Sequence, residues 1–162
     1  MADQSEFLER VQDATFARAT PSTSSSFPER FRLSGADIVT FLARRRTAAL
    51  ATTRPDGRPH AAPTGFALVD SRIVIASIAE ATRITNLRQR PHASLVVNEE
   101  TPDSHGVVII EGTTRLFTPN AASLEVRAPF RLEDGHLPNW IGTFIVLSPE
   151  RIMSYGSEGF TP

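Results

Sequence analysis

The dipeptide formed by Asp56 and Gly57 constrains the fold more than any other feature of this sequence. It stands between two runs rich in small and β-branched residues, at 48–54 and 59–67. Asp-Gly is a preferred pair for tight hairpin turns, because such turns need positive φ angles. A third run of the same kind follows at 72–78, after a second turn signal. These patterns predict three consecutive antiparallel strands.

The rest of the chain adds three strands and at least two helices to this pattern. The stretch SGADIVTFLARRR begins with a serine N-cap and has apolar residues at helical spacing, which predicts a helix at 34–46. A second helix is expected at 82–90, just before a proline. The further strands are expected at 93–100, 106–119 and 143–155. Six strands joined mostly by hairpins predict a mainly β protein, a small antiparallel barrel with short capping helices.

The first part of the chain is separated from this pattern by a run of prolines and serines. Residues 5–17 have apolar residues at helical spacing, but TPSTSSSFP follows them at 20–28. We therefore interpret residues 1–33 as an N-terminal arm that is partly flexible. Residues 34–162 would then form the one barrel domain that a chain of 162 residues can accommodate.

Composition excludes several classes of chemistry. The chain has no cysteine, and all 17 of its basic residues are arginine. A thiolate nucleophile, a zinc–thiolate site and a Schiff-base lysine are therefore excluded. A net charge of −1 gives no field that would attract nucleic acid, and no run of residues has the length and character of a membrane span. We expect a cytoplasmic protein that binds neither nucleic acid nor a membrane.

The stretch EATRITNLRQRP at 80–91 predicts an anion site. It follows the apolar stretch IVIASI of the strand expected at 72–78, and its helix begins with Thr82 and Arg83. A helix N-terminus offers unpaired amide groups and a partial positive charge, to which an arginine adds two more donors. The alternatives are that Ser77 and Thr82 cap the helix and that Arg83 is simply solvated.

Two stretches of the chain resemble one known family. The first contains DGRP at 56–59 and then Ser77, Arg83 and an Asn-Leu pair, and the second is LPNWIGTFIVLSPERIMSYG at 137–156. Both are similar to the pyridoxamine 5'-phosphate oxidase-like superfamily of flavin-binding split barrels, which also includes flavin and deazaflavin oxidoreductases. The resemblance implies a six-stranded antiparallel split β-barrel. It also implies a homodimer with the cofactor between the protomers.

The same resemblance implies roles for particular residues. Ser77, Thr82 and Arg83 would hold the cofactor phosphate, with Arg83 in place of the lysine that the oxidases use. Pro63 and Thr64 would meet the polar edge of the flavin ring, and Trp140 would approach the ring from the partner protomer. A lone tryptophan is otherwise more often a core or interface residue. The family's strand arginine is missing, because Ala62 stands near its place.

From the resemblance we expect the protein to be an oxidoreductase that binds FMN or the deazaflavin coenzyme F420. Of these two cofactors we favour FMN. The cofactor would transfer a hydride to or from a small organic substrate, so no catalytic acid or base and no metal is required. The chain ends in SYGSEGFTP, without the R-x-H-D-R-like motif of true pyridoxamine-phosphate oxidases, and we do not expect that activity. The alternative is a non-catalytic protein that binds or sequesters a flavin, haem or other tetrapyrrole.

Overall fold

The hairpin expected at Asp56 and Gly57 joins the first two strands of the sheet. The computed structural model describes residues 4–162, in which β1 (Thr47–Thr53) pairs antiparallel with β2 (Pro59–Gly65). Gly57 has a φ of 89°, a conformation that side chains disfavour. The Asp56 carboxylate accepts hydrogen bonds from the backbone and the guanidinium of Arg58, which lower its pKa. The turn chemistry of this dipeptide is therefore the one that its sequence predicts.

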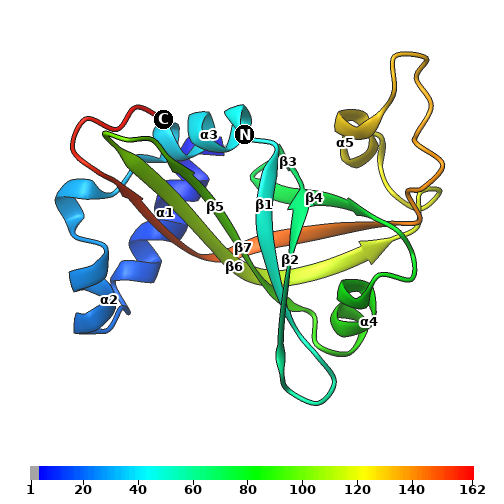
Figure 1. Cartoon of the computed structure of the whole chain (residues 1–162), viewed down its shortest axis with the longest axis horizontal. Helices are drawn as coiled ribbons and strands as arrows, with labels where there is room; N and C mark the ends of the chain where they lie inside the picture. The colour runs from blue at the N-terminus through cyan, green and yellow to red at the C-terminus, as the bar shows by residue number, and fades with distance from the viewer. Residues whose placement is uncertain (1–3) are drawn as a thin grey trace.

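Seven strands form one curled antiparallel sheet within residues 4–162 (Figure 1). Their order across the sheet is β2-β1-β5-β6-β7-β4-β3. The remaining strands are β3 (Ala67–Val69), β4 (Arg72–Ser77), β5 (His92–Glu100), β6 (His105–Phe117) and β7 (Thr143–Gly156). The helices of this part of the chain are α1 (Gln4–Phe16), α2 (Pro21–Ser26), α3 (Gly35–Arg44), α4 (Thr82–Gln89) and α5 (Leu124–Arg127), with short 3-10 turns at Glu29–Phe31 and Ala128–Phe130.

The prediction of a mainly β, barrel-like fold is confirmed, but the prediction of six strands is wrong by one. The strand expected at 59–67 divides at Phe66, whose side chain is 4% exposed and belongs to the core. The Phe66 amide donates to the Arg46 carbonyl, and the chain then continues as β3. The two edge strands of the sheet, β2 and β3, are thus consecutive in sequence. This continuity curls the sheet and brings β2 into contact with β4.

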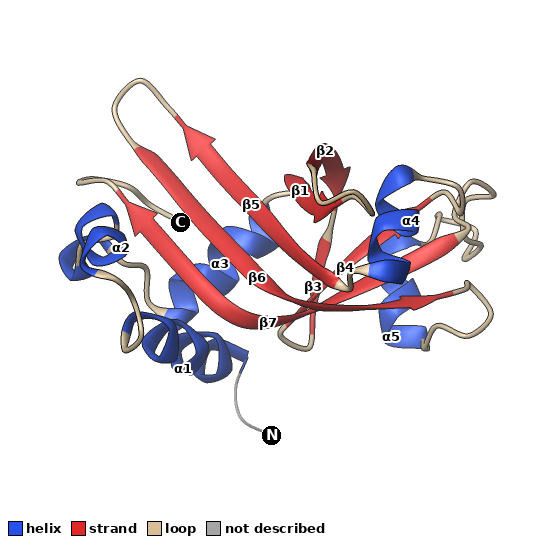
Figure 2. Ribbon diagram, turned by 90° about the horizontal axis from the view of Figure 1, so that it is seen from below, coloured by secondary structure: helices blue, strands red, loops and turns tan. Residues whose placement is uncertain are grey.

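The helix predicted at 34–46 is present as α3, which helps to close one end of the core. The Ser34 hydroxyl accepts a hydrogen bond from the Asp37 amide, as expected of an N-cap. The apolar face of α3 is buried through Ile38, Phe41 and Leu42. It packs on α1 and on the sheet (Figure 2). No helix in residues 4–162 combines the length and the apolar character that a membrane crossing needs.

The apolar residues that have helical spacing within 5–17 lie in the helix α1, and a buried polar network attaches this helix to β7. Gln12 accepts a hydrogen bond from Ser154 Oγ at 2.5 Å and donates one to the Leu33 carbonyl at 2.8 Å. The Leu33 amide donates to Ser154 Oγ at 2.9 Å, so the three groups satisfy one another. Beside them, the Ile152 amide donates to Thr15 Oγ1. α1 therefore covers the edge of β7 that β4 leaves free.

Leu8, on the same helix, is fully buried in the main core. Residues 1–3 of the expected arm lie outside the described residues. The division of the chain at residue 33 and the flexibility of the arm stay predictions.

A second, smaller apolar cluster lies over β4 and β7. It is formed by Val74, Phe144 and Val146 on the sheet, together with Ala122 and Ile141 from the segment that contains α5. The Phe130 ring packs against the Phe144 ring at a tilt of 55°, with ring centroids 5.6 Å apart. This cluster holds the segment between β6 and β7 against the sheet. It therefore fixes the position of the residues that lead into β7.

Replacing Gln12 by leucine tests the network between α1 and β7. The substitution leaves the Leu33 carbonyl without its donor and the Ser154 hydroxyl proton without its acceptor, at a cost of about 1 to 3 kcal/mol. We expect the melting temperature to fall by several degrees, measured by calorimetry. Asp13→Ala, at an exposed position of the same helix, is the control and should change little. Equal melting temperatures for Gln12→Leu and the wild type would show that the network does not stabilise the fold.

Candidate functional site

The end of β4 carries a buried hydroxyl group. Ser77 is the last residue of the strand, and its carbonyl accepts a hydrogen bond of 3.0 Å from the Gly142 amide. Side chains alternate between the two faces along a strand, so the Ser77 side chain lies on the same face as those of Ile73 and Ile75 and opposite to that of Ala76. That face belongs to the main core, which α4 also joins. Ser77 and α4 thus lie on one side of the sheet.

The Ser77 hydroxyl has no partner within the described chain. Two buried side-chain oxygens in residues 4–162 lack a hydrogen bond, one on Glu99 and one on Ser77. The Glu99 carboxylate lies in an ion pair with Arg45, whereas Ser77 Oγ makes no polar contact and its residue is 3% exposed. A buried polar group without a partner costs about 1 to 3 kcal/mol. An acceptor on a ligand would recover this cost.

The N-terminus of α4 is also without a side-chain cap. Its N-cap residue is Ala81, in an extended conformation with φ −61° and ψ 140°. Neither Ser77 nor Thr82 makes a capping hydrogen bond among the described residues, so the alternative that they cap the helix is not what the structure shows. The first amides of a helix have no partners inside it. They remain available to an anion at this point of the chain.

Arg83 stands in the first turn of α4 and is half-buried. Within residues 4–162 its guanidinium forms no ion pair, in contrast to Arg45, Arg58 and Arg151. A cation at a helix N-terminus opposes the helix dipole. A bound anion would offset this unfavourable interaction. The arrangement therefore fits a phosphate better than it fits a purely structural role.

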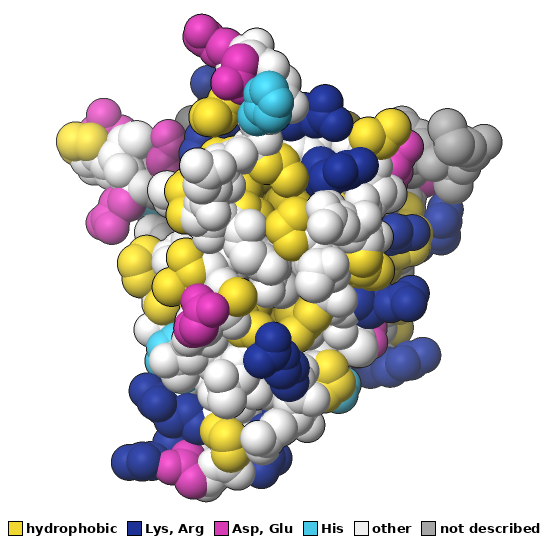
Figure 3. Space-filling model, turned by 90° about the vertical axis from the view of Figure 1, so that its right-hand side faces the viewer, with side chains coloured by type: hydrophobic (Ala, Val, Ile, Leu, Met, Phe, Trp, Pro, Cys, Tyr) yellow, Lys and Arg dark blue, Asp and Glu magenta, His cyan; other side chains and the backbone are white. Residues whose placement is uncertain are grey.

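The segment that contains Trp140 lies against the link between β4 and α4. A Cβ atom on Gly142 would come within 2.8 Å of the Ala79 amide nitrogen, so only glycine allows this approach. Trp140, two residues earlier, is 55% exposed. Figure 3 shows this end of the molecule, where apolar patches and arginine side chains lie near one another. The structure thus brings the Trp140 segment beside the link that joins Ser77 to α4.

Pro63 and Thr64 lie apart from this group, on the edge strand β2. Their side chains point to opposite faces of the strand, because Pro63 is exposed and Thr64 is 8% exposed. Thr64 Oγ1 donates to the carbonyl of the next residue, Gly65. β2 contacts β4, although Pro63 lines a separate shallow groove with residues of β1. Contact of these two residues with a flavin ring stays a prediction.

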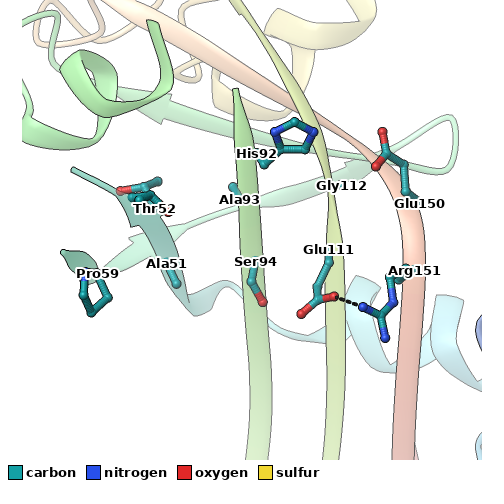
Figure 4. A pocket seen from close by; sticks show the side chains of 11 residues that line it. Ala51, Thr52, Pro59, His92, Ala93, Ser94, Glu111, Gly112, Glu150 and Arg151 are labelled. Atoms are coloured by element: carbon teal, nitrogen blue, oxygen red, sulfur yellow. Dashed lines mark ion pairs between the residues drawn. The ribbon is translucent and has the colours of Figure 1, made fainter. Parts of the chain in front are cut away.

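Another groove, of about 400 Å³, lies on the sheet near the β1–β2 hairpin (Figure 4). The Glu111 and Arg151 side chains form an ion pair of 3.4 Å along one side of it. The pairing of β6 with β7 shifts register here between Glu111 and Gly112, where the Gly112 backbone packs against the Ser148 carbonyl. Neither Ser77 nor Arg83 lines this groove. It is therefore a feature distinct from the anion site.

One interaction beside the candidate site was not predicted from the sequence. Asn86 of α4 is 1% exposed and donates a hydrogen bond of 2.9 Å to Thr52 Oγ1 on β1. The sequence pattern contains Asn86 within an Asn-Leu pair but gives it no partner. The sequence does hold a signal for this bond, because Asn86 is a polar residue in a short helix next to the apolar Leu87. A polar side chain that is buried needs a hydrogen-bond partner.

Comparison with solved structures identifies the fold. A conserved hypothetical protein from Mycobacterium tuberculosis superimposes with a TM-score of 0.65 and 24% identity, over 80% of this chain and 88% of that one. A FAD-binding protein from Mesorhizobium loti gives 0.60 and 21%, over 77% and 96%. A haem storage protein from Vibrio cholerae gives 0.60 and 16%, over 74% and 93%. No curated protein sequence matches at a significant level.

These likenesses, together with the curled sheet, show that the chain has the split-barrel fold. The sequence profile described as pyridoxamine 5'-phosphate oxidase matches residues 35–132, which is more than half of the chain. The protein therefore belongs to the pyridoxamine 5'-phosphate oxidase family. The resemblance seen in the sequence is confirmed at this level.

Proposed function

We propose that this protein binds FMN, with the phosphate between the end of β4 and the N-terminus of α4. The observation that carries the proposal is the buried Ser77 hydroxyl without a partner, beside a helix N-terminus that has no cap. Arg83 would supply a guanidinium fork, and Thr82 a hydroxyl at the exposed rim. These groups are donors, as a phosphate dianion requires. Coenzyme F420 stays the alternative cofactor.

The proposed activity is that of a flavin-dependent oxidoreductase acting on a small organic substrate. The bound flavin would supply the hydride chemistry, and the chain would hold and orient it. Ser77, Thr82 and Arg83 would bind the phosphate, while Pro63, Thr64 and Trp140 would surround the ring. We do not extend the proposal to oxidation of pyridoxamine 5'-phosphate. A cytoplasmic location stays a prediction of the sequence alone.

A non-catalytic role in binding a flavin or haem is the second candidate. A solved neighbour is named a haem storage protein, and a fold can host many functions. A haem iron needs an axial ligand, and His60 on β2 is a half-buried histidine whose Nδ1 lies 3.4 Å from Thr52 Oγ1. The flavin proposal is preferred because it accounts for Ser77, Thr82 and Arg83 together.

The assignment of Arg83 predicts a selective loss of affinity. Arg83→Ala should weaken FMN binding by about 1.5 to 3 kcal/mol, or about 10- to 150-fold in Kd, if the guanidinium pairs with the phosphate. The measurement is a titration of flavin fluorescence or of Trp140 quenching. Arg88→Ala, at an exposed position later in the same helix, is the matched control. Unchanged affinity in Arg83→Ala would overturn the phosphate assignment, and strong haem binding without flavin binding would favour the second candidate.

We also propose that the protein is a homodimer that uses the bare face of β5 and β6. Figure 2 shows α1 and α3 on one side of this part of the sheet and no helix on the other side. Val96 and Ile109 face each other across β5 and β6 and are only half-buried, whereas their neighbours Leu95 and Ile110 are in the core. The exposed Ala49 continues the same row on β1, and Met153, which is 9% exposed, continues it on β7. An apolar row that is partly open to solvent suits a second copy of the chain.

Val96→Arg tests the dimer by placing a charge in the middle of this row. A buried unpaired charge is strongly unfavourable, so the variant should elute as a monomer in size-exclusion chromatography with light scattering. If Trp140 contributes to the partner's site, FMN affinity should fall with dissociation. Thr40→Arg, at an exposed position of α3, is the control and should leave the dimer intact. A wild-type protein that is monomeric at high concentration would contradict the proposal.

A further inference from the structure

A chain of polar side chains connects α4 to two strands of the sheet. Asn86 Nδ2 donates to Thr52 Oγ1 at 2.9 Å, and Thr52 Oγ1 lies 3.4 Å from His60 Nδ1. Asn86 and Thr52 are both buried, at 1% and 4% exposure. The Asn86 amide nitrogen is only a donor, so the Thr52 oxygen must accept, and its proton is free to point to His60. The three residues come from α4, β1 and β2 in turn.

Apart from an exposed hydrogen bond of 3.0 Å from its C-cap residue, Arg90, to the Pro55 carbonyl, the position of α4 depends on few other directional interactions. The helix has eight residues, too few to be stable alone, and its N-cap makes no side-chain hydrogen bond. Its other buried side chains, Ile84 and Leu87, contribute apolar contacts that do not fix a direction. The bond between Asn86 and Thr52 is directional and is shielded from water. It therefore sets how α4 is turned and seated on β1.

Asn86 lies one helical turn after Arg83, at the spacing i, i+3. A rotation or shift of α4 would move Arg83 and the first amides of the helix with respect to Ser77, which belongs to β4 and would stay in place. A phosphate that needs donors from both β4 and α4 would then lose part of its coordination. The anchoring bond thus acts on the anion site without touching the anion.

We propose that Asn86 and Thr52 are positioning residues, which hold α4 in the orientation that binds the cofactor phosphate. This inference rests on the proposed function. His60 extends the same connection to β2, the strand to which the flavin ring is assigned. The polar chain would therefore keep the phosphate-binding and ring-binding elements in a fixed relation.

Thr52→Val is the sharpest test, because valine keeps the shape of threonine and removes the hydroxyl. Binding is measured with two probes, FMN and riboflavin, which share the ring and differ in the phosphate. We expect Thr52→Val to weaken FMN by about threefold to tenfold and to change riboflavin by less than about twofold. Thr52→Ser keeps the hydroxyl and should retain the wild-type preference for FMN. A general loss of structure would weaken both probes together.

Asn86→Leu gives the same test from the helix side, should Thr52→Val not fold. The two changes remove one shared interaction, so their effects on FMN affinity should be clearly less than additive in the double variant. Melting temperatures of all variants are measured alongside. A wild type that binds FMN no better than riboflavin would overturn the proposed phosphate site itself. A wild type that prefers FMN, with the same preference in Thr52→Val, would overturn only the positioning role.

Discussion

The pairing of β7 with two different neighbours is the constraint on which the rest of the structure depends. β7 is bonded to β6 along most of its length but to β4 only from Thr143 to Leu147. Beyond that point Pro149 lies opposite the bulge at Gly112. β4 begins at Arg72, next to the residue that pairs with Leu147, so the ladder with β4 ends here, and Pro149 has no amide proton with which to extend it. The freed edge of β7 is then covered by α1.

The candidate site follows from the first half of the same strand. Ser77, the last residue of β4, is paired with Thr143, the first residue of β7. The residues just before β7 must therefore pass the end of β4, where Gly142 packs on Ala79. The link from β4 into α4 is held by this contact on one side and by Asn86 on the other. Between these two supports lie a hydroxyl without a partner and a helix N-terminus without a cap. Rigid elements thus hold donors that the described chain does not use itself.

Local signals in the sequence predicted most of the elements. The Asp56 and Gly57 turn and the Ser34 cap depend on residues a few positions apart, and both are present. The division at Phe66 was not predicted, because 59–67 has the composition of a continuous strand and only the curl of the sheet requires a break there. The bond between Asn86 and Thr52 spans 34 residues and cannot be inferred from local pattern. Ser77 was singled out by resemblance, but its lack of a partner is visible only in the folded chain.

The most direct test of the central claim is hydrogen exchange at the amides of Thr82 and Arg83, followed by mass spectrometry or NMR in the presence of FMN or riboflavin. If the phosphate accepts hydrogen bonds from the first turn of α4, FMN will slow exchange at these amides and riboflavin will not. Protection by both flavins alike, or by neither, would contradict the claim that this helix N-terminus holds the phosphate.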